Sequence, residues 1–214
     1  MTEGQPPVTV DDEELEERKD RWRRRIRQAR QQRSARSRDA DAQALAAVVT
    51  AIPQVAAARC VTLYAARPGE LGTGPLLEAL AERGTRVLLP VLGSGLARDW
   101  AAYAGPDDLR ERAPGRPPEP SGPPLGREAI AEADVLLVPA LAVDTDGTRL
   151  GQGGGWYDRA LRTAAPGVPV IALTYAEEVH DAATEPLPRE PHDRQVDAVA
   201  TPSGVTWFRA PAAG

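Results

Sequence analysis

The stretch DVLLVPALAVDTDGTRLGQGGGWYDRAL (Asp134–Leu161) decides the fold of this 214-residue chain. It begins with the most hydrophobic run in the sequence, bounded by turn residues, which is typical of a buried strand. A glycine-rich loop follows, and residues 156–164 then form a predicted helix. Because glycine loses much backbone freedom when it is ordered, such a cluster favours a backbone that approaches a ligand closely. A loose turn is the alternative.

Strand-like and helical segments alternate on both sides of this stretch. The predicted strands cover residues 60–66, 85–92, 98–103, 134–143 and 167–175, with two more within 195–208. The predicted helices begin near residue 11 and cover 39–52, 75–84, 127–133 and 156–164, with Asp39 or Asp41 as the cap of the second. This alternation predicts an α/β fold of three layers, in which helices cover both faces of a largely parallel sheet.

Length and composition are those of a globular protein with a proper core, with 42% hydrophobic and 27% charged residues. We expect a flexible N-terminus at 1–10, a single domain at 11–209 and a tail at 210–214. No apolar run reaches the length of about 18 residues that a membrane span requires, and the acidic N-terminus lacks a secretory signal. Cys60 is the only cysteine, which excludes an internal disulfide and suits the reducing cytoplasm.

The glycine-rich loop and its flanks, Arg149–Arg159, suit a phosphate group. Ligands bind beyond the carboxyl ends of strands in such sheets, where loop N–H groups and a helix N-terminus attract anions. Arg149 and Arg159 would add full positive charges. The spacing matches neither the Walker pattern nor the dinucleotide fingerprint, whose third glycine would fall on Trp156. The adjoining DTDG (Asp144–Gly147) lacks the further ligands of a calcium loop, so we predict a tight turn there.

Several separated motifs occur in the order found in one enzyme family. They are Lys19-x-x-x-Arg23, a strand followed by Pro-Gly-Glu at 64–70, Pro-Glu-Pro at 118–120, the long stretch at 138–161, and EPHDRQVDAVAT at 190–201. Together they resemble the 5-formyltetrahydrofolate cyclo-ligase family over nearly the whole chain. Lys19 is also the only lysine in a chain that otherwise uses arginine, which favours a specific role for it.

The resemblance implies an α/β fold, Rossmann-like and similar to CoA-transferases and isomerases, and a reaction that requires ATP and Mg²⁺. ATP would phosphorylate the formyl oxygen of 5-formyltetrahydrofolate, and the neighbouring amine would attack the activated carbon. Phosphate would then leave to give 5,10-methenyltetrahydrofolate. Phosphoryl transfer of this kind needs phosphate clamps and a divalent ion more than a dedicated nucleophile.

The resemblance also assigns roles to individual residues. The residues expected to bind ATP are Lys19, Arg23, Arg149, Leu150, Gly151, Gln152, Gly153, Gly154, Gly155, Trp156 and Tyr157, of which Arg149, Gln152 and Tyr157 would be catalytic. The residues expected to contact the folate are Ala65, Glu70, Gln152, Gly153, Gly154, Gly155 and Trp156. Asp158 and Asp193 would bind Mg²⁺, because carboxylates are hard ligands for a hard ion.

The chain departs from the family pattern in places. Gly72 stands where many members have aspartate, and Gly115 and Arg116 stand where an aromatic residue often packs near the pterin. The residues that could stack on the pterin instead are Trp100, Tyr103 and Trp156. We expect His192 in a turn and not as a base, and His180 at a helix end.

Two other functions stay open at this point. A member of the family could act on another compound, or on no folate. Alternatively, the ten arginines between Arg18 and Arg38 could form an arm that binds nucleic acid, although the net charge of −5 and the scarcity of interleaved aromatic residues argue against it. We expect a cytoplasmic monomer that binds a small folate and neither membrane nor nucleic acid.

Overall fold

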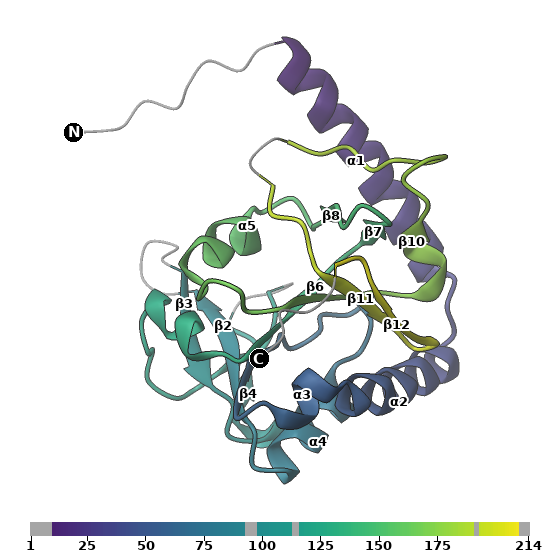
Figure 1. Cartoon of the computed structure of the whole chain (residues 1–214). Helices are drawn as coiled ribbons and strands as arrows, with labels where there is room; N and C mark the ends of the chain where they lie inside the picture. The colour runs from purple at the N-terminus through teal and green to yellow at the C-terminus, as the bar shows by residue number, and fades with distance from the viewer. Residues whose placement is uncertain (1–9, 93–97, 113–115, 191–192, 210–214) are drawn as a thin grey trace, which may run out of the picture.

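The computed structural model describes residues 10–92, 98–112, 116–190 and 193–209 (Figure 1). The sequence predictions for residues 1–9 and 210–214, for Gly115 and for His192 therefore fall outside the described residues. Within them, no helix is both long enough and apolar enough to cross a membrane.

The centre of the molecule is a seven-stranded sheet with the strand order β12-β11-β9-β6-β1-β2-β3. Its strands are β1 (Cys60–Thr62), β2 (Arg86–Leu92), β3 (Arg98–Ala102), β6 (Val135–Pro139), β9 (Val170–Leu173), β11 (Ala198–Thr201) and β12 (Gly204–Trp207). The five inner strands run parallel, and the two edge strands β12 and β3 are antiparallel to their neighbours. The prediction of a largely parallel sheet is confirmed.

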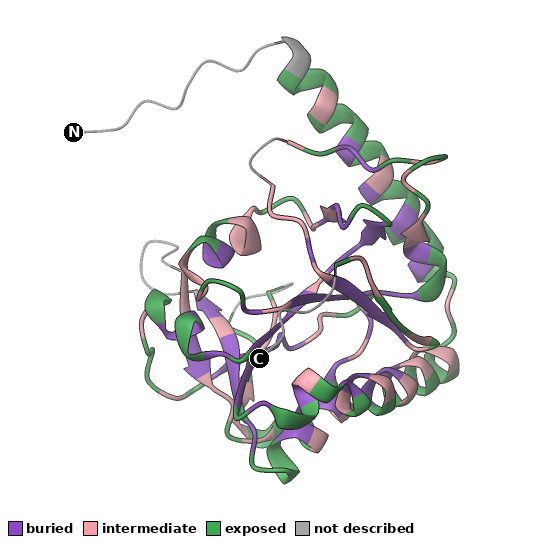
Figure 2. Ribbon diagram, in the orientation of Figure 1, coloured by how far each residue is buried: buried purple, intermediate pink, exposed green. Residues whose placement is uncertain are grey.

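Helices cover both faces of this sheet. Alternate residues of β6 show the two faces, because Val135 and Leu137 belong to one apolar cluster and Leu136 and Val138 to another. The first cluster includes residues of α2 (Ala35–Ala51), α3 (Pro53–Ala57) and α4 (Gly74–Glu82). The second includes residues of α5 (Trp156–Ala160) and of the 3-10 helices η3 (Arg127–Glu132) and η4 (Leu161–Thr163). Figure 2 shows the central strands buried between exposed helix surfaces, as a three-layer fold requires.

Helix α1 (Val10–Gln31) packs on a smaller three-stranded sheet instead (Figure 1). That sheet has the order β10-β7-β8 and consists of β7 (Ala142–Asp144), β8 (Arg149–Leu150) and β10 (Val179–His180). Ile26 and Trp22 of α1 pack in an apolar cluster with Leu141 and Leu150. Two further strands, β4 (Leu109–Arg110) and β5 (Glu119–Pro120), pair with each other, and the remaining 3-10 helices are η2 (Pro106–Asp108) and η5 (Ala176–Glu178).

Several predicted boundaries were wrong. The apolar run 134–143 is divided between two sheets, because the chain leaves the main sheet after Pro139 and Leu141 N donates to the Leu150 carbonyl. The strand predicted at 60–66 ends at residue 62, and the predicted helices at 127–133 and 156–164 are a 3-10 helix and a short α-helix that continues as 3-10.

The cap of α2 was also predicted wrongly. Neither Asp39 nor Asp41 caps it, because Ser34, five residues before Asp39, does so: its Oγ accepts a hydrogen bond from Ser37 N at 3.1 Å. Asp41 pairs with Arg33 at 2.8 Å instead.

The tight turn predicted at DTDG is confirmed. Asp144 Oδ1 accepts hydrogen bonds from the backbone N–H groups of Asp146 and Thr148. Gly147 has a φ of +84°, and a Cβ there would lie 2.5 Å from the Val196 carbonyl oxygen, so only glycine fits.

Candidate active site

The glycine-rich loop connects β8 to α5 and lies against α1. Arg23 Nε donates to the Gly151 carbonyl at 3.2 Å. Gly153 has a φ of +103°, and a Cβ at that position would lie only 3.3 Å from the Arg23 guanidinium carbon. Glycine is therefore needed here both for the backbone conformation and for the close approach of a cation.

Lys19 and Arg23 lie one turn apart on α1 and are both buried. Lys19 Nζ lies 3.1 Å from Glu190, 3.3 Å from Glu16 and 3.4 Å from Asp193. Burial opposes the charge of Lys19, but the hydrogen bond to Glu190 and the nearby carboxylates outweigh burial and raise the pKa of Lys19. The single lysine of the chain is thus a buried cation, one turn from the Arg23 side chain that contacts the loop.

Arg149 extends from β8 toward the first turn of α5. Its Nη2 donates to Asp158 Oδ1 at 2.5 Å, and its Nη1 donates to the Pro139 carbonyl at the end of β6 at 3.2 Å. The Nε group of Arg149 is buried without a partner among the described residues. Buried donors are normally hydrogen-bonded, so this N–H is a candidate contact for a bound anion.

Glu70 and Gln152 meet across the site, although 82 residues separate them in sequence. Gln152 Nε2 donates to Glu70 Oε1 at 2.9 Å, and Arg67 Nη2 donates to the same oxygen at 3.0 Å. From the other side, Arg27 of α1 donates to the Gln152 carbonyl at 2.9 Å and to its side-chain oxygen at 3.0 Å. A continuous polar chain therefore links α1, the glycine-rich loop and the loop before α4. Arg27 was not among the predicted site residues, because its only signal in the sequence is its position one turn after Arg23.

Three aromatic side chains cluster where α5 meets β3. The rings of Trp156 and Tyr157 are 4.8 Å apart, and Trp100 of β3 meets Trp156 at 5.0 Å. Burial, which is the largest cause, raises the pKa of Tyr157 well above its ordinary value. Tyr157 Oη and Trp156 Nε1 are buried and lack a partner among the described residues. Trp100 is one of the aromatic residues considered for stacking on the pterin, but it is only 1% exposed. It therefore packs against Trp156 inside the protein.

The two carboxylates expected to bind Mg²⁺ both contact cations of the chain. Asp158 pairs with Arg149, and Asp193 contacts Lys19 and also accepts a hydrogen bond from Glu190 N at 2.9 Å. Over the described residues there is no group of three or more His, Cys, Asp or Glu side chains that could hold a metal.

The other residues expected at the site are placed as follows. Leu150 is buried in the apolar cluster beneath α1, and Ala65 is buried in the cluster that faces α2 and α4. Gly154 has open space around its α-carbon, whereas its carbonyl accepts a hydrogen bond from Arg159. Gly72 lies where a Cβ would be 3.0 Å from that of Ala42, so a side chain at this position would require α2 to shift slightly.

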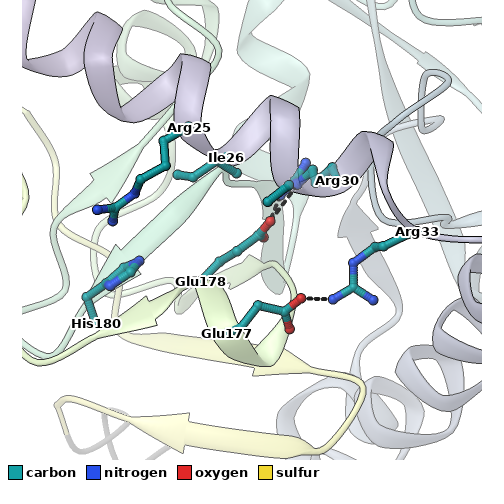
Figure 3. Close-up of a pocket in the computed structure, with 8 residues that line it drawn as sticks. Arg25, Ile26, Arg30, Arg33, Glu177, Glu178 and His180 are labelled. Atoms are coloured by element: carbon teal, nitrogen blue, oxygen red, sulfur yellow. Dashed lines mark hydrogen bonds and ion pairs between the residues drawn. The ribbon is translucent and has the colours of Figure 1, made fainter.

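Helix α1 is anchored at its C-terminal half by a buried ion pair (Figure 3). Arg30 Nε and Nη2 donate to the two carboxylate oxygens of Glu178 at 2.7 Å each, and Nη2 also donates to the Ala140 carbonyl. Arg33 pairs with Glu177 beside it. These residues line a pocket whose two glutamates are already paired with Arg30 and Arg33, and we interpret it as part of the anchor.

His180 differs from the prediction because it lies in β10, two residues after η5, and not at the end of an α-helix. Its Nδ1 lies 2.9 Å from Glu185, and its ring meets the edge of Trp22 at 4.7 Å. His180 therefore packs against Trp22 of α1, and none of its contacts among the described residues is with the glycine-rich loop.

Fold and site together define a three-layer α/β protein with a cationic site around a glycine-rich loop. The model of the 5-formyltetrahydrofolate cyclo-ligase family matches residues 15–202. A 5-formyltetrahydrofolate cyclo-ligase from Mycolicibacterium smegmatis is 43% identical over 157 residues, covering 71% of this chain and 78% of the relative. One from Escherichia coli K12 is 36% identical over 156 residues, covering 72% and 83%.

Solved structures agree with the sequence relatives. The 5,10-methenyltetrahydrofolate synthetase of Aquifex aeolicus superposes with a TM-score of 0.75 at 25% identity, covering 92% of this chain and 95% of that one. The Mycoplasma pneumoniae synthetase has the same fold, with a TM-score of 0.65 at 19% identity. This chain belongs to the 5-formyltetrahydrofolate cyclo-ligase family.

Proposed function

We propose that this protein converts 5-formyltetrahydrofolate to 5,10-methenyltetrahydrofolate and uses ATP, which becomes ADP and phosphate. One observation carries most of the weight: buried cations of α1 and β8 converge on a glycine-rich loop in a member of the cyclo-ligase family. The names of the curated relatives supply the reaction.

The nucleotide side of the site would consist of Lys19, Arg23, Arg149 and the loop 150–157. ATP supplies the phosphoryl group, and the chain positions it and neutralises the charge that develops on it. The unpartnered Arg149 Nε and Tyr157 Oη would donate to phosphate oxygens, since a buried donor without a partner is costly and a bound anion removes that cost.

The folate side would consist of Glu70, Gln152, Trp156 and Ala65. Glu70 is held by Gln152 and Arg67, so its carboxylate is oriented before the substrate binds. A fixed carboxylate suits the N–H donors of a reduced pterin, and the nearby Trp156 ring offers an apolar face. Gln152 contacts both α1 and Glu70, which supports a position for it between the two substrates.

The residues present fit a magnesium ion shared with a nucleotide better than one bound by the protein alone. Mg²⁺ commonly binds one or two carboxylates together with substrate phosphates and water. Asp158 and Asp193 would provide those carboxylates, and both now balance a cation that would turn to phosphate in the complex.

The test is formation of 5,10-methenyltetrahydrofolate, followed by its near-UV absorbance, with and without ATP and Mg²⁺. Asp158→Asn should lower turnover about 100-fold or more, because it removes one of the two carboxylates proposed to hold Mg²⁺ at the transferring phosphate. Asp146→Asn, an exposed residue in the DTDG turn, is the matched control and should leave the rate unchanged. A folded wild-type protein that binds ATP but forms no product would overturn the proposal and indicate another substrate.

A further inference from the structure

The flank of the glycine-rich loop next to β3 contains a second pair of cations. Trp100 of β3 and Trp156 of α5 are in ring contact at 5.0 Å, which joins these two elements. Arg98 is two residues before Trp100 and therefore points to the same face of the strand. Arg159 is three residues after Trp156 and lies on the same side of its helix. Both arginines thus flank the aromatic contact.

Arg159 contacts the loop itself. Its Nη2 donates to the Gly154 carbonyl at 2.9 Å, and a Cβ on Gly155 would lie 3.3 Å from the same nitrogen. Arg98 Nε is buried and has no partner among the described residues. Burial first, and then the positive charge of Arg159, lower the pKa of Arg98. The two guanidinium groups therefore lie close enough for their like charges to interact unfavourably.

The charge balance of this pair differs from that of the cations on α1. Arg23, Arg25 and Arg30 each pair with a carboxylate. No carboxylate of the described residues forms an ion pair with Arg98 or Arg159. The neighbouring Asp99 instead accepts hydrogen bonds from the backbone N–H groups of residues 100 and 126, and Asp158 is paired with Arg149.

We propose that Arg98 and Arg159 form an anion subsite that binds the glutamate carboxylates of the folate substrate. This assignment rests on the proposed function. The phosphates have their own cations on the α1 side of the loop, whereas Trp156, the candidate for the pterin, borders the Arg98 side. Guanidinium groups bind carboxylates through paired N–H donors, and an anion here would relieve the repulsion between the two arginines.

The experiment compares Arg98→Gln, Arg159→Gln and the double variant on two substrates, 5-formyltetrahydrofolate and 5-formyltetrahydropteroate, which lacks the glutamate. Each single variant should raise KM for the folate about tenfold, the effect of losing a hydrogen bond to a charged group. For Arg98→Gln, KM for ATP and kcat should stay unchanged, and the pteroate substrate should not distinguish this variant from wild type. Arg36→Gln, an exposed arginine of α2, controls for the change in net charge.

Two outcomes would overturn the subsite: an unchanged KM for the folate in the double variant, or an increase in KM for ATP alone, which would assign the pair to the nucleotide. Equilibrium binding of the folate, followed by quenching of tryptophan fluorescence, separates this proposal from the proposed function. Wild-type protein that binds the folate without turnover contradicts the reaction. Equal affinity in wild type and double variant contradicts the subsite.

Discussion

Both halves of α1 contain buried cationic side chains, but these cations have different kinds of partner. In the C-terminal half, Arg30 is 4% exposed and donates only to fixed groups: Glu178, Thr174 and the Ala140 carbonyl. In the N-terminal half, Lys19 and Arg23 are nearly as buried, but they contact loop carbonyls and carboxylates that a ligand could replace. Burial alone therefore does not separate an anchoring cation from a binding one.

The nature of the partners separates the two halves instead. Residues 19, 23, 27 and 30 follow helical spacing and form one stripe along α1. The end of the stripe at Arg30 fixes the helix to the protein, and the other end holds cations over the glycine-rich loop. We infer that the Arg30 anchor positions the binding half of α1, which contains Lys19 and Arg23. Substitutions in either half can test this.

The largest expected effect comes from removing the anchor. Arg30→Met leaves Glu178 buried and charged without its partner, which should lower the free energy of unfolding by about 3–5 kcal/mol. Urea denaturation measures this directly. Arg30→Met combined with Glu178→Leu should recover much of the loss, because no isolated charge remains. An Arg30→Met protein as stable as wild type would mean that the pair does not anchor α1.

The second effect concerns the binding half and should appear in catalysis. Lys19→Met removes a buried cation from the proposed phosphate site and should lower kcat/KM for ATP about 100-fold. Lys19→Arg should recover only part of this, because a wide planar guanidinium replaces a compact ammonium among Glu16, Glu190 and Asp193. If Lys19→Met lowered stability and left the kinetics of ATP unchanged, the two halves of α1 would both be anchors.

Much of this architecture can be predicted from sequence, but not the division within α1. The parallel sheet follows from the apolar runs, and the loop with Arg149 and Asp158 follows from the local motif. Arg30 and Glu178 are 148 residues apart, and no local pattern pairs them. The division of the run 134–143 between two sheets also has no local signal, because the hydrophobicity of the run is continuous across the break.

The smallest effect is expected at Arg27, which lies between the two halves. It is exposed but holds Gln152 through the loop carbonyl and the side-chain oxygen, and Gln152 in turn holds Glu70. Arg27→Ala should raise KM for the folate about fivefold, the effect of roughly one net hydrogen bond, and leave stability unchanged.

Steady-state kinetics with the folate varied at saturating ATP measures the effect of Arg27→Ala. Arg25→Ala is the matched control, since Arg25 is also exposed and pairs with Glu185 away from the loop. Its loss should leave KM unchanged and alter stability by no more than a few tenths of a kcal/mol. In a Gln152→Ala background the side-chain part of the Arg27 effect should disappear. If Arg27→Ala still raised KM for the folate to the full extent there, Arg27 would act on the substrate itself and the binding half of α1 would extend one turn further.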